Sequence, residues 1–198
     1  GPEITFKNFE GLVPDAGGMA LMSYANSELV NPASGWDDLA RLRDLWPGKL
    51  VVKGVMTGPD ASHAVAHGAD GIIVSNHGGR QLDGLPATID ALPEVVDAVG
   101  ARADVMLDGG VRRGADVLAA LALGAKAVLI GRPYLWALAS QGERGVTEVL
   151  RMLREELDAA MALTGRPTID TIGPDLLWRG SQGRPGIDGI PTSDARDA

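Results

Sequence analysis

Side chains that can move protons or bind anions follow three apolar segments of the sequence. Lys53 ends the first segment, His77 and Arg80 follow the second, and Asp108 ends the third. A histidine titrates near neutral pH and can act as a general base, and an arginine can hold a carboxylate through two hydrogen bonds. A lysine is almost never fully buried without a partner, so Lys53 is a candidate cation facing a developing negative charge. These residue types predict chemistry on a substrate that carries a carboxylate.

Each of these residues also has a purely structural interpretation. Lys53 could be a strand-end lysine that reaches water, His77 a loop histidine bonded to the backbone, and Arg80 a surface arginine paired with Asp83. We favour the functional interpretation because all three follow strand-like segments. In parallel α/β folds, the chemistry collects at the carboxyl ends of the strands.

Two glycine-rich turns add a candidate anion site. Gly109 and Gly110 precede Arg112, and Gly131 precedes Arg132. Backbone N–H groups exposed at such turns bind phosphate, and the start of a following helix adds a favourable field. The sequence contains neither a GxGxxG after a strand nor a GxxxxGK[ST], which disfavours a Rossmann dinucleotide site and a Walker NTPase. The turns therefore predict a phosphate-bearing cofactor of another class.

A histidine pair offers a weaker candidate for a metal site. His63 and His67 are spaced as i and i+4 on a predicted helix, a spacing that can hold a metal ion. No third ligand supports the pair, so we interpret it as part of a solvated helix face and predict no metal.

Alternating strand and helix patterns position the candidate residues. Four short, nearly continuous apolar segments have the pattern of parallel strands buried on both faces: 50–54, 71–75, 105–109 and 127–131. Helical patterns follow them at 60–67, 89–99, 114–123 and 145–163. This order predicts an α/β fold with a parallel sheet. Another helix is expected at 36–45, with Ser34 as its N-cap and Asp37 at the capping-box position.

Composition limits the class of protein. The chain has 198 residues, of which 45% are hydrophobic and 22% charged, and its formal net charge of −8 argues against a nucleic-acid partner. The absence of cysteine excludes disulfides, thiolate nucleophiles and Cys-based zinc sites. No apolar segment approaches the ~18 residues that span a bilayer. Residues 1–31 are expected to form a loop, residues 32–178 one unit, and residues 179–198 a disordered tail with little to bury.

Four segments, taken in order, resemble the FMN-dependent 2-hydroxy-acid oxidases and dehydrogenases, a family that includes glycolate oxidase and the lactate and mandelate dehydrogenases. The segments are VVKGV (51–55), GIIVSNHGGRQLDG (71–84), LDGGVRRGADVLAALALGA (107–125) and VLIGRP (128–133). The resemblance implies a (β/α)₈ TIM barrel, FMN as the cofactor, and oxidation of a small 2-hydroxy acid, of the lactate, glycolate or mandelate type, to the 2-oxo acid.

The resemblance also implies a role for each residue at the strand ends. His77 corresponds to the catalytic base and Arg80 to the arginine that holds the substrate carboxylate. Lys53 corresponds to a lysine that both binds the flavin and stabilises its reduced ring. The remaining positions correspond to residues that contact the flavin, its ribityl chain or its phosphate: Ser75, Asp108, Gly109, Gly110, Arg112, Gly131 and Arg132.

A barrel has eight βα units over ~250 residues, and this sequence shows four. We therefore expect units five to eight of a barrel, with residues 1–31 as the remnant of the loop after strand four. A separate N-terminal half-barrel polypeptide is expected to complete the enzyme, because open sheet edges and a large apolar surface favour aggregation.

Family analogy further predicts a homo-oligomer, a tetramer, in the cytoplasm, with membrane contact only through the missing loop. Two alternatives remain open. One is a flavin-dependent oxidase of another substrate, such as a modified peptide. The other is an inactive proteolytic half-barrel fragment.

Overall fold

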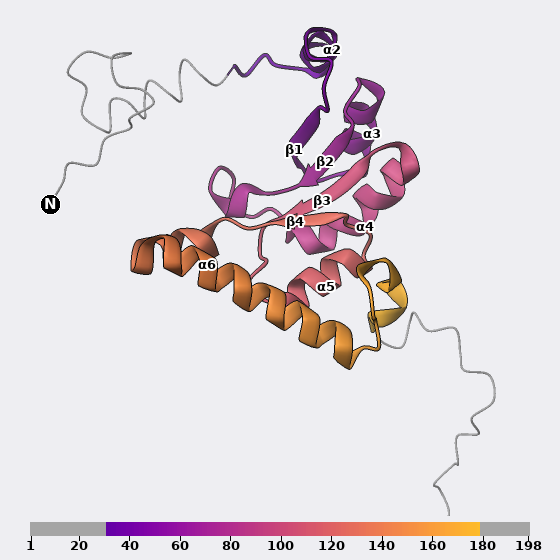
Figure 1. Cartoon of the computed structure of the whole chain (residues 1–198). Helices are drawn as coiled ribbons and strands as arrows, with labels where there is room; N and C mark the ends of the chain where they lie inside the picture. Colours follow the sequence, from indigo (N-terminus) through magenta and orange to yellow (C-terminus); the bar gives the residue numbers. More distant parts are fainter. Residues whose placement is uncertain (1–30, 179–198) are drawn as a thin grey trace, which may run out of the picture.

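The computed structural model describes residues 31–178, in which strands and helices alternate along the chain (Figure 1). The strands are β1 (Val51–Val55), β2 (Gly71–Val74), β3 (Asp104–Asp108) and β4 (Ala127–Leu129). The α-helices are α2 (Trp36–Leu45), α3 (Gly58–Ala66), α4 (Thr88–Val99), α5 (Gly114–Ala122) and α6 (Arg132–Leu163). Short 3-10 turns are η2 (His77–Gly79), η3 (Gly100–Arg102), η4 (Ile169–Thr171) and η5 (Pro174–Leu176). The loop predicted for the N-terminus, apart from its last residue, and the tail predicted for 179–198 lie outside the described residues.

The four strands form one parallel sheet in the order β1-β2-β3-β4, which confirms the predicted α/β fold. Helices α3, α4 and α5 lie along one side of this sheet (Figure 1). A doubly wound sheet reverses its strand order and carries helices on both faces, whereas a barrel wall keeps the sequential order with its helices outside. The arrangement is that of a segment of barrel wall.

Strand register separates the two faces of the sheet. Val52, Ile72 and Val105 are in register and face the helices, where they belong to or pack against the buried core. The next row, which contains Lys53 and Ile73, must face the opposite side because successive side chains of a strand alternate. The inner row thus carries Lys53 beside the apolar Ile73 and Met106, whereas the outer row is apolar throughout.

A one-residue bulge in β1 determines where Val55 points, relative to Lys53 before it. Lys53 pairs with Ile73 and Val55 pairs with Val74, so Gly54 is skipped between them. Gly54 has a φ of +102°, which favours glycine. Without the bulge, Lys53 and Val55 would share a face. With it, Val55 reaches the core and Lys53 faces the inner side.

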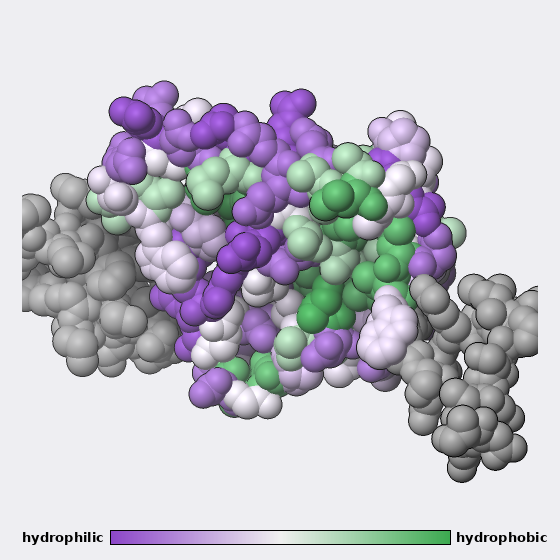
Figure 2. All heavy atoms as spheres, turned by 90° about the horizontal axis from the view of Figure 1, so that it is seen from below, coloured by the Kyte–Doolittle hydropathy of each residue, from purple (hydrophilic) through white to green (hydrophobic). Residues whose placement is uncertain are grey.

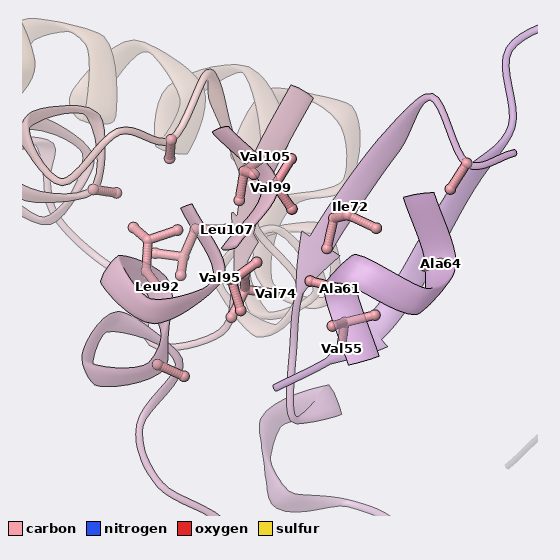
Figure 3. Close-up of a cluster of buried hydrophobic side chains, with 14 of the residues drawn as sticks. Val55, Ala61, Ala64, Ile72, Val74, Leu92, Val95, Val99, Val105 and Leu107 are labelled. Carbon is pink, nitrogen blue, oxygen red and sulfur yellow. The ribbon is translucent and has the colours of Figure 1, made fainter. Parts of the chain in front are cut away.

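The hydrophobic core lies between the sheet and helices α3 and α4 (Figure 3). Ile72, Val74 and Leu107 from the strands meet Leu92 and Val95 of α4, and all five side chains are fully buried or nearly so. The inner face is different, because no element among residues 31–178 covers it and Val51 remains 43% exposed. Burial on both faces, predicted from the continuous apolar segments, is thus found for the central strand β2, whose four residues are all buried, but not for the edge strand β1.

One predicted helix cap was wrong, and one helical segment was missed. The N-cap of α2 is Gly35 rather than Ser34, and the carboxylate that accepts from its backbone N–H belongs to Asp38 rather than Asp37, at 3.0 Å. Non-helical dihedral angles at Gln141 and Gly142 divide α6 into two parts, of which the second covers the predicted 145–163 and the first, which begins at Arg132, was not predicted. The early start arises because the turn after β4 leads directly into helix, with proline in its first turn.

An ion-pair cluster fastens α2 to the amino end of the sheet. Asp70 accepts hydrogen bonds from Arg43 and Lys49, both at 2.8 Å, and from the backbone N–H of Leu50 at 2.9 Å. Arg43 also donates to backbone carbonyls at Gly68 and Gly48. The hydrogen bonds from Lys49 and Leu50 lower the pKa of Asp70 from 3.8 to about 2.

We expect Asp70→Asn to lower the midpoint of thermal unfolding at pH 7, because Arg43 and Lys49 lose their anionic partner. The carboxylate titrates at about pH 2 in the folded protein and near 3.8 when unfolded, so its stabilisation is complete above 3.8 and is lost as pH falls through 2. The difference in midpoint between wild type and variant should therefore disappear near pH 2. Asp44→Asn, at an exposed α2 carboxylate with no ion pair among residues 31–178, is the control. A difference for Asp70→Asn that persists unchanged at pH 2 would contradict the assignment.

Candidate active site

One cleft at the carboxyl edge of the sheet gathers almost all of the predicted site residues. Its volume is about 260 Å³, and its walls come from the ends of β1 and β3, the η2 turn, the turn before α5 and the start of α6. The predicted residues that line it are Lys53, His77, Arg80, Asp108, Gly109, Gly110, Arg112, Gly131 and Arg132. Ser75 is the exception, since it lies in a neighbouring depression and is only 2% exposed. The structure thus brings together side chains that follow all four strands.

The Ser75 hydroxyl joins three strand ends. It donates to Asp108 Oδ2 at 2.6 Å and accepts from Lys53 Nζ and from the His77 backbone N–H, each at 3.1 Å. A hydroxyl has one donor and two acceptor positions, so its hydrogen-bonding capacity is fully used. The cluster fixes the ends of β1, β2 and β3 relative to one another.

Asp108 and Lys53 form an ion pair on the inner face. Lys53 Nζ lies 2.8 Å from Asp108 Oδ2, and the Lys53 side chain is 40% exposed. Burial by itself raises the pKa of Asp108, but hydrogen bonds from Lys53 and Ser75 and the nearby positive charge outweigh it and lower that pKa. Asp108 is therefore ionised, and the ammonium of Lys53 keeps an accessible side toward the cleft.

The η2 turn presents His77 in a strained backbone conformation. His77 has a φ of +53°, a left-handed value that no other non-glycine residue of 31–178 adopts. The residue is exposed, and no side chain among the described residues hydrogen-bonds its imidazole. Such strain persists only where surrounding contacts impose it, and it clusters at functional sites.

Arg132 holds the η2 turn from the opposite side of the cleft. Its Nη2 donates to the carbonyl oxygen of Gly78 at 3.1 Å. Gly78 has a φ of +67°, and a Cβ at this position would lie 2.5 Å from the same nitrogen. Position 78 consequently requires glycine, both for its dihedral angle and for the approach of the guanidinium.

The two glycine turns differ in what they leave for an anion. The N–H groups of Arg112 and Arg113 at the start of α5 already donate to Asp116 Oδ2, both at 2.9 Å, so they are not available to a phosphate. No side chain caps the start of α6. Space is open beside Gly110 and Gly131, where a Cβ would stand. The groups that remain available for an anion are therefore the arginine side chains, the open glycines and the start of α6, rather than the start of α5.

Two alternatives from the sequence can now be compared with the structure. Arg80 forms no ion pair with Asp83 or with any other carboxylate of 31–178, so the structural interpretation of Arg80 finds no support. His63 and His67 stack on Trp36 of α2, with ring centroids 5.7 and 6.1 Å away. The histidine pair is thus part of the contact between α2 and α3, and no group of three metal-binding side chains occurs in the described part of the chain.

Sequence reasoning missed several residues that shape the site. Asn76 hydrogen-bonds both ends of the loop that carries His77, and the buried Thr88 donates to the Gly109 carbonyl oxygen at 3.1 Å. Trp136 lines the cleft from α6 while remaining 60% exposed. The position of Asn76 directly before a turn was a signal for capping, but nothing in the sequence marks the other two residues.

Comparisons with known proteins agree on one group of relatives. A family model described as FMN-dependent dehydrogenase matches residues 8–179. The chain is 51% identical over 185 residues to 2-hydroxyacid oxidase 1 of Mus musculus, covering 89% of this chain and 49% of that protein. It is 52% identical over 165 residues to an L-lactate oxidase of Nostoc sp., covering 83% and 45% respectively.

Comparison with solved structures finds relatives of the same kind. A soluble mutant of the membrane-associated (S)-mandelate dehydrogenase from Pseudomonas putida superposes with a TM-score of 0.76 at 46% identity, covering 90% of this chain and 50% of that one. The chain spans about half the length of the relatives that it matches. No helix among residues 31–178 is long and apolar enough to cross a membrane.

We expect Ser75→Ala to reduce the free energy of unfolding by about 1–3 kcal/mol, because a partly buried ion pair and a backbone N–H lose their shared partner. Urea denaturation measures this difference. Ser62→Ala is the matched control, since Ser62 makes one hydrogen bond of 3.4 Å, to the Ala98 carbonyl oxygen. Equal losses for the two variants would show that the Ser75 cluster contributes nothing beyond an ordinary serine contact.

Proposed function

This chain belongs to the FMN-dependent dehydrogenase family, and we propose that it supplies the C-terminal half of an enzyme that oxidises a 2-hydroxy acid to the 2-oxo acid. The observation that carries this proposal is a single cleft lined by a histidine, an arginine and a lysine, His77, Arg80 and Lys53. Lactate, glycolate and mandelate are substrates of the required kind. They place a carboxylate beside an oxidisable carbon.

FMN is the cofactor that the cleft fits. Arg112 and Arg132 provide positive charge beside the open glycines 110 and 131, and the uncapped start of α6 adds a field that favours an anion. These four residues would hold the phosphate. Asp108 is an ionised acceptor suited to a ribityl hydroxyl, while Lys53, Ser75 and Gly109 would lie toward the ring. When bound, FMN supplies the two-electron acceptor of the reaction.

The chain's own residues would bind and deprotonate the substrate. Arg80 has no carboxylate partner among residues 31–178, so its guanidinium is available to hold a substrate carboxylate through two hydrogen bonds. His77, exposed in the same cleft, would accept the proton that the substrate loses. Lys53 would stabilise negative charge that develops beside it, since its ammonium lines the cleft.

We also propose that an N-terminal half-barrel polypeptide completes the site. Strands β1 and β4 are the edges of the described sheet, and its inner face is uncovered. Figure 2 shows apolar surface beside charged surface on one face, and a soluble protein seldom leaves such patches open. The missing half would also provide a partner for the imidazole of His77. The assembled enzyme is proposed to be a cytoplasmic homo-tetramer. Its membrane contact would be made only through the loop after the fourth strand of the complete barrel, a strand that precedes β1.

Anaerobic reduction of the complete, FMN-loaded protein tests the reaction. We expect lactate, glycolate or mandelate to bleach the flavin absorbance. Bleaching by a modified peptide but by none of these acids would instead support a different oxidase. A flavin that binds but is bleached by no substrate, or a chain that binds no flavin, would identify an inactive fragment.

We expect His77→Asn to leave FMN bound but to lower turnover by ~10²–10⁴, the usual contribution of a general base. Asparagine tolerates the left-handed conformation at this position, so the turn should persist. Steady-state kinetics and the flavin absorbance of the purified variant measure both effects. Simultaneous loss of flavin and activity would mean that His77 has been assigned the wrong role.

Arg80→Lys should raise KM for the 2-hydroxy acid by ~10-fold or more and change kcat less, because lysine cannot form the two-point contact with a carboxylate. Arg113→Lys is the matched control, since Arg113 precedes α5 and does not line the cleft. Unchanged KM in Arg80→Lys would count against the carboxylate contact.

A further inference from the structure

We infer that Asn76 is a positioning residue that holds His77 and Arg80 in their working geometry, an inference that rests on the proposed function. Asn76 lies two residues after the end of β2 and is half-buried, and it does not line the cleft that contains His77, Arg80 and Lys53. Its side chain nevertheless contacts the beginning and the end of the loop that carries both residues. Its role would therefore be exerted through that loop rather than by touching the substrate.

The first contact fixes the turn immediately after His77. Asn76 Oδ1 accepts from the Gly78 backbone N–H at 2.9 Å, and the Asn76 carbonyl oxygen accepts from the Gly79 N–H at 3.0 Å. Together they close the η2 turn around His77, whose own N–H donates to Ser75. The left-handed backbone of His77 is thus bracketed by hydrogen bonds on both neighbouring peptide groups. A strained backbone conformation persists only where surrounding contacts impose it, and these hydrogen bonds are such contacts.

The second contact closes the loop. Asn76 Nδ2 donates to the Pro86 carbonyl oxygen at 3.2 Å, ten residues along the chain. Arg80 lies between these two anchor points, and its side chain makes no ion pair within the described residues. The rest of the loop is largely exposed and has few contacts to hold it. The two hydrogen bonds of the Asn76 amide therefore restrict the motion of the loop backbone that carries Arg80.

The amide of Asn76 also lies close to the candidate cofactor turn. A Cβ added to Gly109 would stand 3.3 Å from Asn76 Oδ1 and 3.1 Å from Thr88 Oγ1, so glycine is what lets the turn pass this close. Gly109 and Gly110 line the cleft directly. The anchored loop and the turn proposed for FMN are therefore neighbours. An aliphatic residue could fill the same space but could not provide both a donor and an acceptor.

The test compares two substitutions in the complete FMN-loaded enzyme. Asn76→Ala removes both side-chain hydrogen bonds, whereas Asn76→Ser keeps an acceptor for the Gly78 N–H, as serine does at helix N-caps, but cannot reach Pro86. We expect Asn76→Ala to lower kcat by ~10–100-fold, the effect of misplacing a reacting group by about 1 Å. Asn76→Ser should recover most of kcat while KM stays raised, since the Arg80 end of the loop remains released. The Kd of FMN should change less than about threefold in both variants, because neither substitution touches the arginines that provide charge for the phosphate.

Thr57→Ala is the control for general destabilisation, because Thr57 caps α3 through the Asp60 N–H and lies outside the cleft. We expect it to lower the thermal midpoint without changing kcat, KM or FMN affinity. The inference is overturned if Asn76→Ala retains kcat and KM within twofold of wild type. It is equally overturned if Asn76→Ser and Asn76→Ala lose kcat to the same extent. A wild-type enzyme that binds FMN but oxidises no 2-hydroxy acid would refute the proposed function instead, and the two failures are therefore distinguishable.

Discussion

The site depends on one buried hydroxyl shared between three strands. Ser75 uses its donor on Asp108 and its two acceptor positions on Lys53 and the His77 N–H, so no hydrogen-bonding capacity is left over. Parallel strands bring their carboxyl ends to one edge, but they do not by themselves fix the relative height of those ends. The Ser75 cluster does so, and it places a cation, a carboxylate and a strained histidine at the same edge.

The second constraint is backbone conformation around the cleft. Gly54 permits the bulge that brings Val55 to the core while Lys53 stays on the inner face, and Gly78 permits the approach of Arg132 to the histidine turn. Both glycines have positive φ, and both precede or follow a residue proposed to act in the reaction. The high glycine content of the chain thus has a local physical reason at these positions. It allows backbone and charged side chains to approach more closely than a Cβ would permit.

Charge is organised locally although the chain as a whole is acidic. The formal net charge is −8, yet the cleft is lined by Lys53, Arg80, Arg112 and Arg132 with Asp108 as its carboxylate. A cationic cleft in an acidic protein favours small anions over polyanionic surfaces, because the field is strong only inside the cleft. This distribution agrees with a substrate carboxylate and a cofactor phosphate as the two proposed occupants.

The sequence alone determined the element order, the parallel sheet and the charged side chains that line the cleft, but not its apolar wall. These features follow from local patterns, since apolar segments, turn glycines and charged residues after strands are all readable along the chain. Only the tertiary structure decided which of these groups remain free to bind a ligand and how the others are held in place. It showed that Asp116 already occupies the amides before α5, that Asn76 anchors the η2 loop, and that a bulge separates Lys53 from Val55. The bulge depends on strand register, and because a one-residue slip in register reverses the face of every following side chain, no local pattern can specify it. The hydrogen bonds of Asp116 and Asn76 join residues close in sequence, but such polar side chains have several possible backbone partners nearby, and only the folded loop selects among them.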